Sequence, residues 1–111
     1  MDDLTKHVIS FLETIGDPIR MEIIKLMKEG EITAKEIEDK LDISQSYTSQ
    51  QLKTLDDEEL INTRKEGTMK FYSIRHKDIY KVFSVISSFV VEKERKKFSR
   101  LSKLDKLNSL E

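Results

Sequence analysis

Two short amphipathic helices separated by a three-residue break constrain this chain more than any other feature. The first is predicted over residues 34–41, where Thr33 and Glu36 have the spacing of a capping box and apolar residues recur at helical intervals. Ser44, the last residue of the break "DIS", caps a second helix predicted over residues 44–57. Two short helices joined in this way form a helix-turn-helix, a motif whose second helix can enter the major groove of DNA.

Caps, turn residues and apolar spacing predict the other elements. A first helix over residues 4–15 ends at "GDP", where Asp17 caps and Pro18 opens a second helix that extends to about residue 28. "EIT" is a short extended link, and "LINTRK" and "MKFYSI" around "EGT" are typical of a β-hairpin. A last helix begins near residue 78. The expected fold is mainly α with a small β-hairpin wing: a dimeric winged helix-turn-helix in the order helix, helix, short strand, helix, helix, strand, strand, helix.

The outward face of the helix over residues 44–57 is almost free of charge, although 37% of the chain is charged. Its members are Gln45, Ser46, Ser49, Gln50 and Lys53. Acidic side chains there would be repelled by DNA phosphates, whereas Gln and Ser can hydrogen-bond to bases or phosphates. Ser44 would lie where the free backbone N–H groups of a helix N-terminus attract a phosphate. The pattern favours a DNA-facing helix over the alternative, an ordinary solvent-exposed surface.

The net charge of −1 conceals segments of opposite charge. Residues 1–43 carry eleven acids and six bases, whereas residues 62–77 carry five bases and one acid. Such asymmetry indicates a local basic surface on the hairpin. Candidates for contact with phosphates or the minor groove are Arg64, Lys65 and Lys70, with Arg75 and Lys77 undecided. The alternative is that these bases protect an edge strand from aggregation.

The totals indicate one domain, over residues 1–91, with a basic helical extension over residues 92–111. The extension holds seven bases against four acids, and its helical pattern continues less regularly through Phe98, Leu101, Leu104 and Leu107. A hydrophobic content of 37% is low for a monomer with a full core. The apolar stripe from Ile79 to Val90 also needs a partner, so we expect a homodimer.

Several classes of protein are excluded by what the sequence lacks. The chain has no cysteine and two histidines, so we expect no disulfide, no metal and no cofactor. It has no glycine-rich phosphate loop, nucleophile elbow or HExxH motif, so we do not expect an enzyme. We do not expect the acidic start "MDDLTKHVIS" to be a signal peptide, and no run approaches the ~18 apolar residues of a membrane span. We expect a cytoplasmic protein with no membrane partner.

Three segments, "IGDPIRMEIIKLM", "EITAKEIEDKLDISQSYTSQQLKTLDDEELI" and "TRKEGTMKFYSI", resemble the ArsR family of winged-helix transcriptional regulators, a resemblance that covers residues 11–75. It implies a homodimer that binds operator DNA through Gln45, Ser46, Tyr47, Ser49 and Gln50, to which the residue pattern adds Ser44 and Lys53. It also implies that the first and last helices form the dimer interface. The candidates there are Leu4, Val8, Phe11, Ile79, Val82, Phe83, Ile86, Phe89 and Val90.

The sequence departs from the family pattern at sensing and turn positions. Family metal sensors use a cysteine pair near the start of the third helix, where residues 33–35 here are Thr, Ala and Lys. Others use His and Asp on the last helix, but no second histidine follows His76. We therefore do not expect metal or arsenic sensing. Asp42 and Glu59 replace the usual turn glycines, and Asp tolerates left-handed backbone well enough for the turn to form.

The leading hypothesis is a sequence-specific transcriptional regulator that binds double-stranded DNA as a homodimer. The helix over residues 44–57 would lie in the major groove and the wing over residues 62–74 on the backbone or in the minor groove. A repressor is favoured because such proteins commonly compete with polymerase for promoters. Two alternatives are an architectural winged helix with little sequence preference, against which the near-zero net charge argues, and a winged helix used for protein–protein contact.

Overall fold

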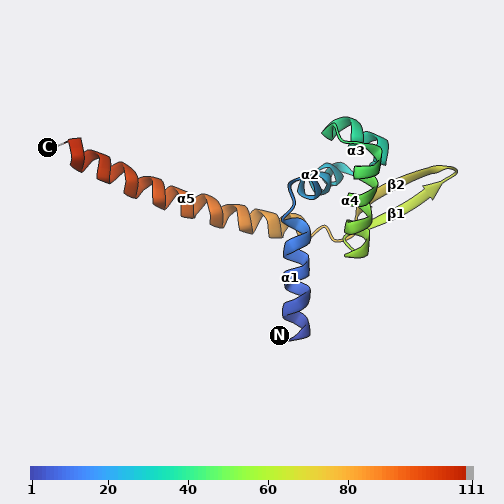
Figure 1. The fold of residues 1–111 in the computed structure, drawn as a ribbon, viewed down its shortest axis with the longest axis horizontal. Helices are drawn as coiled ribbons and strands as arrows, with labels where there is room; N and C mark the ends of the chain where they lie inside the picture. The colour runs from blue at the N-terminus through green and yellow to red at the C-terminus, as the bar shows by residue number, and fades with distance from the viewer. Residues whose placement is uncertain (110–111) are drawn as a thin grey trace. The chain divides into compact units, whose positions relative to one another are not determined.

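A computed structural model describes residues 1–109 of the chain, with side chains described to residue 106 (Figure 1). The chain divides into two compact units, Met1–His76 and Lys77–Glu111. The Leu107 side chain and residues 110–111, which belong to the predicted C-terminal extension, lie outside the described residues.

The first unit contains the helix-turn-helix and the hairpin in the predicted order. Its elements are α1 (Asp3–Ile15), α2 (Pro18–Leu26), the 3₁₀ turn η1 (Met27–Glu29), α3 (Ala34–Leu41), α4 (Gln45–Asp57), β1 (Ile61–Glu66) and β2 (Met69–Ile74). The second unit consists of one long helix, α5 (Ile79–Ser109). The fold is a winged helix-turn-helix, so the predicted fold class is confirmed, and no described helix is long and apolar enough to cross a membrane.

Side-chain caps fix where the helices begin. The Asp17 carboxylate accepts hydrogen bonds from two backbone N–H groups of the first turn of α2, each at 3.0 Å. Thr33 and Glu36 form the predicted capping box at the start of α3. The Ser44 hydroxyl accepts from the backbone N–H of Tyr47 at 3.1 Å and caps α4. These caps confirm the helix starts that the sequence indicated.

The turn between α3 and α4 depends on a left-handed residue. Asp42 has φ 54° and ψ 53°, and it accommodates this conformation without a glycine. Glu59, just after α4, also has a positive φ of 59°. These are the two positions where Asp and Glu replace the usual glycines, and both adopt the left-handed backbone; the turn expected at Asp42 is confirmed.

The hairpin is antiparallel, with pairs running from Ile61–Ile74 to Glu66–Met69 and Gly67 in the turn at φ 62°. The predicted second strand is confirmed, and the first is displaced by one residue from the prediction. The predicted short strand at "EIT" is a single bridge, in which Ile32 and Tyr72 exchange backbone hydrogen bonds of 2.9 and 2.8 Å. β2 therefore pairs with β1 on one side and with the link before α3 on the other.

The core of the first unit lies where the helices meet the base of the hairpin. Ile23 and Ile24 of α2, Ile37 of α3, Leu55 of α4 and Ile61 of β1 are completely buried. Burying one such side chain stabilises the fold by roughly 1.5–3 kcal/mol. The inward stripes of α3 and α4 thus hold the two helices in a fixed relation to the wing.

Candidate nucleic-acid interface

The outward face of α4 is uncharged over most of its length and exposed. Gln45, Ser46, Ser49, Gln50 and Lys53 are all exposed, and Tyr47 is half-buried. The opposite stripe, formed by Thr48, Gln51, Leu52 and Leu55, is buried. The structure therefore places the predicted polar residues on the outside of the helix, where they are available to a partner.

Two polar contacts tether α4 and the residue that follows it to α1 and α2. The Arg20 guanidinium donates from Nε to the Thr14 carbonyl at 2.7 Å and from Nη1 to Gln51 Oε1 at 2.9 Å. The Ser10 hydroxyl donates to Glu58 Oε1 at 2.7 Å. A hydrogen bond that involves a charged group contributes about 1.5–3 kcal/mol, so the tethers resist rotation of α4 about its own axis.

The sequence prediction did not include Gln51, which lies among the polar residues of α4 and looks like another member of its outward face. Its spacing of three from Thr48 and four from Leu55 places it on the inward stripe, and this is the signal that could have identified it. With 8% of its surface exposed, it supports the interface from behind.

The ends of α4 differ in charge. Ser44 caps the N-terminus, and its hydroxyl lies 3.4 Å from that of Ser46. At the other end, Lys53 Nζ lies 3.1 Å from a carboxylate oxygen of Asp57. The acidic run that begins at Asp56 is therefore confined to the last turn of α4 and the residues after it.

One groove joins α4 to the wing. Its lining residues are Ser49, Leu52, Lys53 and Asp56 from α4 and Thr63, Lys70 and Tyr72 from the hairpin. Lys53 and Lys70 thus lie on opposite walls of one surface depression. Burial raises the pKa of the Tyr72 hydroxyl, and the nearby Asp56 carboxylate adds to this effect.

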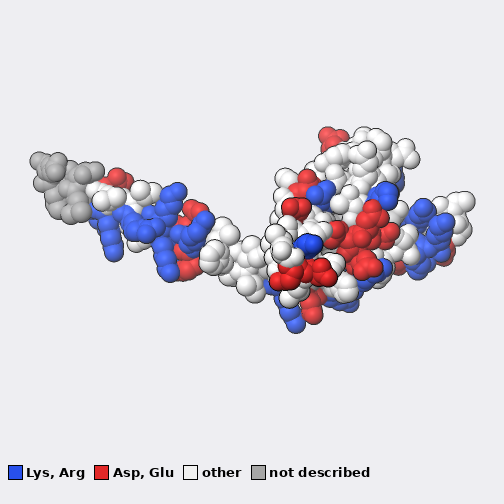
Figure 2. All heavy atoms as spheres, turned by 60° about the horizontal axis from the view of Figure 1, so that its bottom comes forward, with Lys and Arg blue, Asp and Glu red and all other residues white. Residues whose placement is uncertain are grey.

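Lys65 and Lys70 are directly opposite each other across the hairpin. Like charges at such a cross-strand pair are destabilising. Among the described residues, neither forms an ion pair of 4.0 Å or less with a carboxylate. Figure 2 shows basic side chains gathered over the hairpin. A polyanion bound there would relieve the repulsion between the two ammonium groups.

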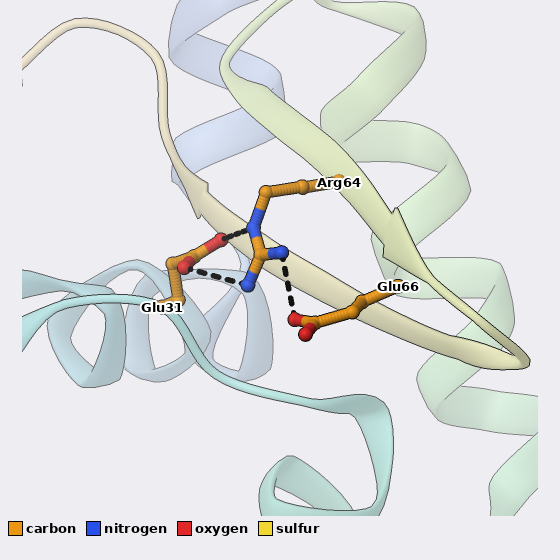
Figure 3. Close-up of polar contacts among 3 residues, drawn as sticks. All are labelled: Glu31, Arg64 and Glu66. Atoms are coloured by element: carbon orange, nitrogen blue, oxygen red, sulfur yellow. Dashed lines mark hydrogen bonds and ion pairs between the residues drawn. The ribbon is translucent and has the colours of Figure 1, made fainter.

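Arg64 is already engaged within the protein (Figure 3). Its guanidinium grips the Glu31 carboxylate in a two-point contact of 2.9 and 3.1 Å, and a third bond of 3.0 Å goes to Glu66. Its Cζ lies 4.6 Å from the centroid of the Phe71 ring. This guanidinium holds the pKa of Glu31 below its usual range. The contact ties β1 to the link before α3.

Alternation along β1 places Arg64 and Lys65 on opposite faces of the hairpin. The sequence prediction grouped the two as DNA contacts. The structure separates them, because one side chain is bound to two carboxylates and the other projects from the face that includes Lys70. The DNA contact of Arg64 stays a prediction, and in the structure its guanidinium holds the wing to the link before α3.

Most of the predicted dimer-interface residues have exposed apolar side chains. Leu4 and Val8 of α1 are exposed, as are Val82, Ile86, Phe89 and Val90 of α5. Phe11 and Phe83 are half-buried. Ile79 differs from the prediction, because it is only 4% exposed and is already covered within one protomer. The other residues provide the apolar surface that an interface requires.

The part of the chain that the structure describes contains no group of three or more His, Asp or Glu side chains placed to hold a metal ion. His7 and His76 are both exposed.

Comparison with known proteins identifies relatives of this architecture. Residues 17–63 match the family model described as bacterial regulatory protein, arsR family. The chain is 35% identical over 71 residues to the arsenical resistance operon repressor of Staphylococcus xylosus, a match that covers 64% of this chain and 68% of that protein.

Many solved structures share the fold, including two from mycobacteria. The crystal structure of Rv0081 from Mycobacterium tuberculosis superposes with a TM-score of 0.79 at 24% identity, over 87% of this chain and 98% of that one. The solution structure of the homodimeric winged helix-turn-helix DNA-binding domain Mb0332 from Mycobacterium bovis gives a TM-score of 0.71 at 23% identity, over 83% and 89% of the two chains.

Proposed function

The chain belongs to the ArsR family of bacterial regulatory proteins, and on this premise we propose that it is a homodimeric repressor that binds operator DNA. The observation that carries the proposal is the exposed face of α4, on which Gln45, Ser46, Ser49 and Gln50 carry no charge. A surface that faces water alone has no need to exclude acids, whereas a surface that meets phosphates does.

In this proposal α4 enters the major groove. Gln45 and Gln50 can each donate and accept hydrogen bonds at an adenine edge, and the serine hydroxyls can bond to either bases or phosphates. Ser44 and Tyr47 lie in the first turn or at its cap, where the N-terminal end of the helix favours an anionic group. Lys53 and Lys70 would bind phosphates along the groove that they line.

The wing contributes contacts that carry no sequence information. Lys65 and Lys70 project from one face of the hairpin toward the phosphate backbone or the minor groove. Arg64 keeps this face in place through Glu31 and Glu66. Phosphate contacts of this kind determine much of the affinity and its salt dependence, while α4 would determine which DNA sequence is preferred.

A second copy of the chain is the proposed partner for the exposed apolar residues of α1 and α5. The winged helix-turn-helix DNA-binding domain Mb0332 is a homodimer, which supports the same arrangement here. Two copies related by a twofold axis would bind a palindrome with half-sites about one helical turn, or ~34–36 Å, apart. DNA binding of this kind needs no catalytic residue, cofactor or metal. A protein with this function is expected in the cytoplasm.

Selection of bound sequences from a random duplex pool, followed by gel shift, tests the proposal. We expect a palindromic site that is bound at least ~10³-fold more tightly than random duplex. Gln45→Ala and Gln50→Ala should each weaken binding to the selected site. Each should also lower the discrimination between bases at one position of that site by about 1–3 kcal/mol. Equal affinity for selected and random duplexes would instead indicate an architectural protein.

The protein–protein alternative has its own outcome in the same experiment. If no duplex is bound more tightly than ~10⁻⁴ M at 50 mM salt, which is the weak end of non-specific binding, the proposal is wrong.

A control variant for the α4 substitutions is Lys40→Gln on α3, whose side chain is exposed but does not belong to the α4 face.

A further inference from the structure

The C-terminal half of α5 has an acid-free basic face. Lys93, Lys96, Lys97, Arg100 and Lys103 fall within about a third of the helix circumference, given 3.6 residues per turn. All five side chains are exposed. Figure 2 shows the gathering of basic side chains along this helix. We name this set the α5 basic face.

The acids of the same segment lie elsewhere on the helix or already have partners. Glu92 pairs with Arg95 at 3.2 Å, and Glu94 approaches Lys93 at 3.8 Å. Within residues 1–106, no ion pair of 4.0 Å or less joins an acid to the other four members of the α5 basic face. Their charge is therefore not neutralised by the protein.

The spacing of these residues opposes helix formation. Lys93 and Lys97 are four residues apart, as are Lys96 and Arg100, and Lys103 follows three residues later. Like charges at these spacings destabilise a helix. The negative end of the helix dipole attracts cations only within the last turn, and Arg100 lies well before the end of α5 at Ser109. A bound polyanion would compensate for this repulsion.

We propose that the α5 basic face binds the phosphate backbone of double-stranded DNA, as a second nucleic-acid contact in addition to α4 and the wing. The inference rests on the proposed function, which brings duplex DNA to the protein. Like the outward face of α4, the α5 basic face excludes acids, but it uses full charges in place of Gln and Ser. Full charges suit phosphates and carry no base recognition, so this contact adds affinity without specificity.

An anionic membrane is the competing partner for a basic helix with apolar residues. The exposed apolar residues of this segment are Phe98, Leu101 and Leu104, of which only Leu104 falls within the α5 basic face. Helical spacing places Glu94 and Asp105 in the same sector as Phe98 and Leu101. Insertion of that sector into a bilayer would bury two carboxylates, which is costly. Duplex DNA requires no such burial.

The test compares two variants of the full-length protein with equal charge loss. The first, Lys96→Gln with Arg100→Gln, removes two cations from the α5 basic face. The second, Arg95→Gln with Lys106→Gln, removes two cations from another side of α5. The equilibrium constant for binding to the selected duplex is measured over a range of salt concentrations for both variants and the unmodified protein.

We expect the first variant to reduce the slope of log K against log salt by about 2 per protomer, since each phosphate contact contributes about 0.9. When salt is lowered from 0.2 to 0.1 M, its affinity should rise about 3.5-fold less per protomer than that of the unmodified protein. The slope of the control should change by less than half as much. Circular dichroism should show unchanged or greater helix content, because like-charge repulsion is removed. Equal slopes for the two variants would overturn the inference.

Two further outcomes would also overturn it. One is tighter binding to phosphatidylserine-containing vesicles than to random duplex, lost in the first variant. The other is a change of oligomeric state in the first variant on sedimentation, which would assign the face to self-association. The ratio of affinities for selected and random duplexes reports separately on the proposed function. If that ratio is near one in every variant, the proposed function fails whatever the slopes show.

Discussion

The two helices of the helix-turn-helix have similar inner faces and different outer ones. Ile37 on α3 and Leu55 on α4 are both completely buried. The exposed positions of α3 are charged, with Lys35, Glu36, Asp39 and Lys40 in a helix of eight residues. The exposed positions of α4 carry amide and hydroxyl groups up to Lys53. Packing explains what the helices share, and only the partner of the outer face explains how they differ.

The comparison also holds within α4. Its acids are confined to the last turn, where Asp57 pairs with Lys53 and Asp56 lines the groove beside the wing. Glu58, which follows the helix, accepts a hydrogen bond from Ser10. Two of these carboxylates therefore have partners in the protein, at the end of α4 away from the turns that we propose face DNA. Acids are tolerated on this helix only at that end.

The largest expected effect concerns the buried inner faces that α3 and α4 have in common. Ile37→Ala and Leu55→Ala should each lower the free energy of unfolding by about 2–5 kcal/mol, because each leaves a cavity at a fully buried site. Urea denaturation checks both values. A loss below ~1 kcal/mol at one site and not the other would show that the inner faces are not equivalent.

The second prediction concerns the outer faces of α3 and α4, which differ in charge. Gln50→Glu places one acid on the outer face of α4 and should weaken binding to the selected duplex roughly 30- to 100-fold, because a like charge is brought to the phosphates. Lys40→Gln makes the same change in net charge on α3 and should weaken binding less than about threefold. Gel shift at fixed salt measures both, and equal losses would contradict the contrast between the two faces.

The third prediction addresses the turns that frame the two helices. Glu59→Gly should raise the free energy of unfolding by about 1 kcal/mol, since a left-handed residue with a Cβ is strained. Asp42→Gly should stabilise by about half as much, because Asp tolerates this region better than Glu. Thermal denaturation shows which of the two variants is stabilised more. Destabilisation by either change would show that its side chain makes a contact more important than the strain.

The smallest expected effect tests the brace between the wing and the start of α3. Glu31→Gln removes an acid from a DNA-binding protein, and electrostatics alone would strengthen DNA binding. We expect binding to weaken about two- to threefold instead, because the two-point contact with Arg64 is lost and the wing is less fixed. Tighter binding would instead indicate that Arg64, once released, contacts phosphates.

Much of the fold could be predicted because the signals are local. The caps at Asp17, Thr33 and Ser44 and the Gly67 turn act over three or four residues, and each appears in the structure as expected. The outer face of α4 could be predicted for the same reason, because helical spacing alone separates it from the buried stripe. The one-residue displacement of β1 shows the limit of such local signals at element boundaries.

The missed contacts join residues far apart in the chain. Arg20 and Gln51 are separated by 31 positions, and Glu31 and Arg64 by 33. Periodicity does not reveal which acid a given arginine will reach across such distances. For this reason Arg64 could be predicted only as a basic residue of the wing.

The tethers behind α4 separate the task of holding the helix from the task of reading a target. Arg20 and Ser10 hold α4 through Gln51 and Glu58, none of which belongs to the outward face. Outward residues such as Gln45 and Gln50 can therefore be exchanged, over evolution or by design, while the framework stays intact. A few substitutions on this one exposed surface could change the operator sequence that is recognised, with little loss of folding stability.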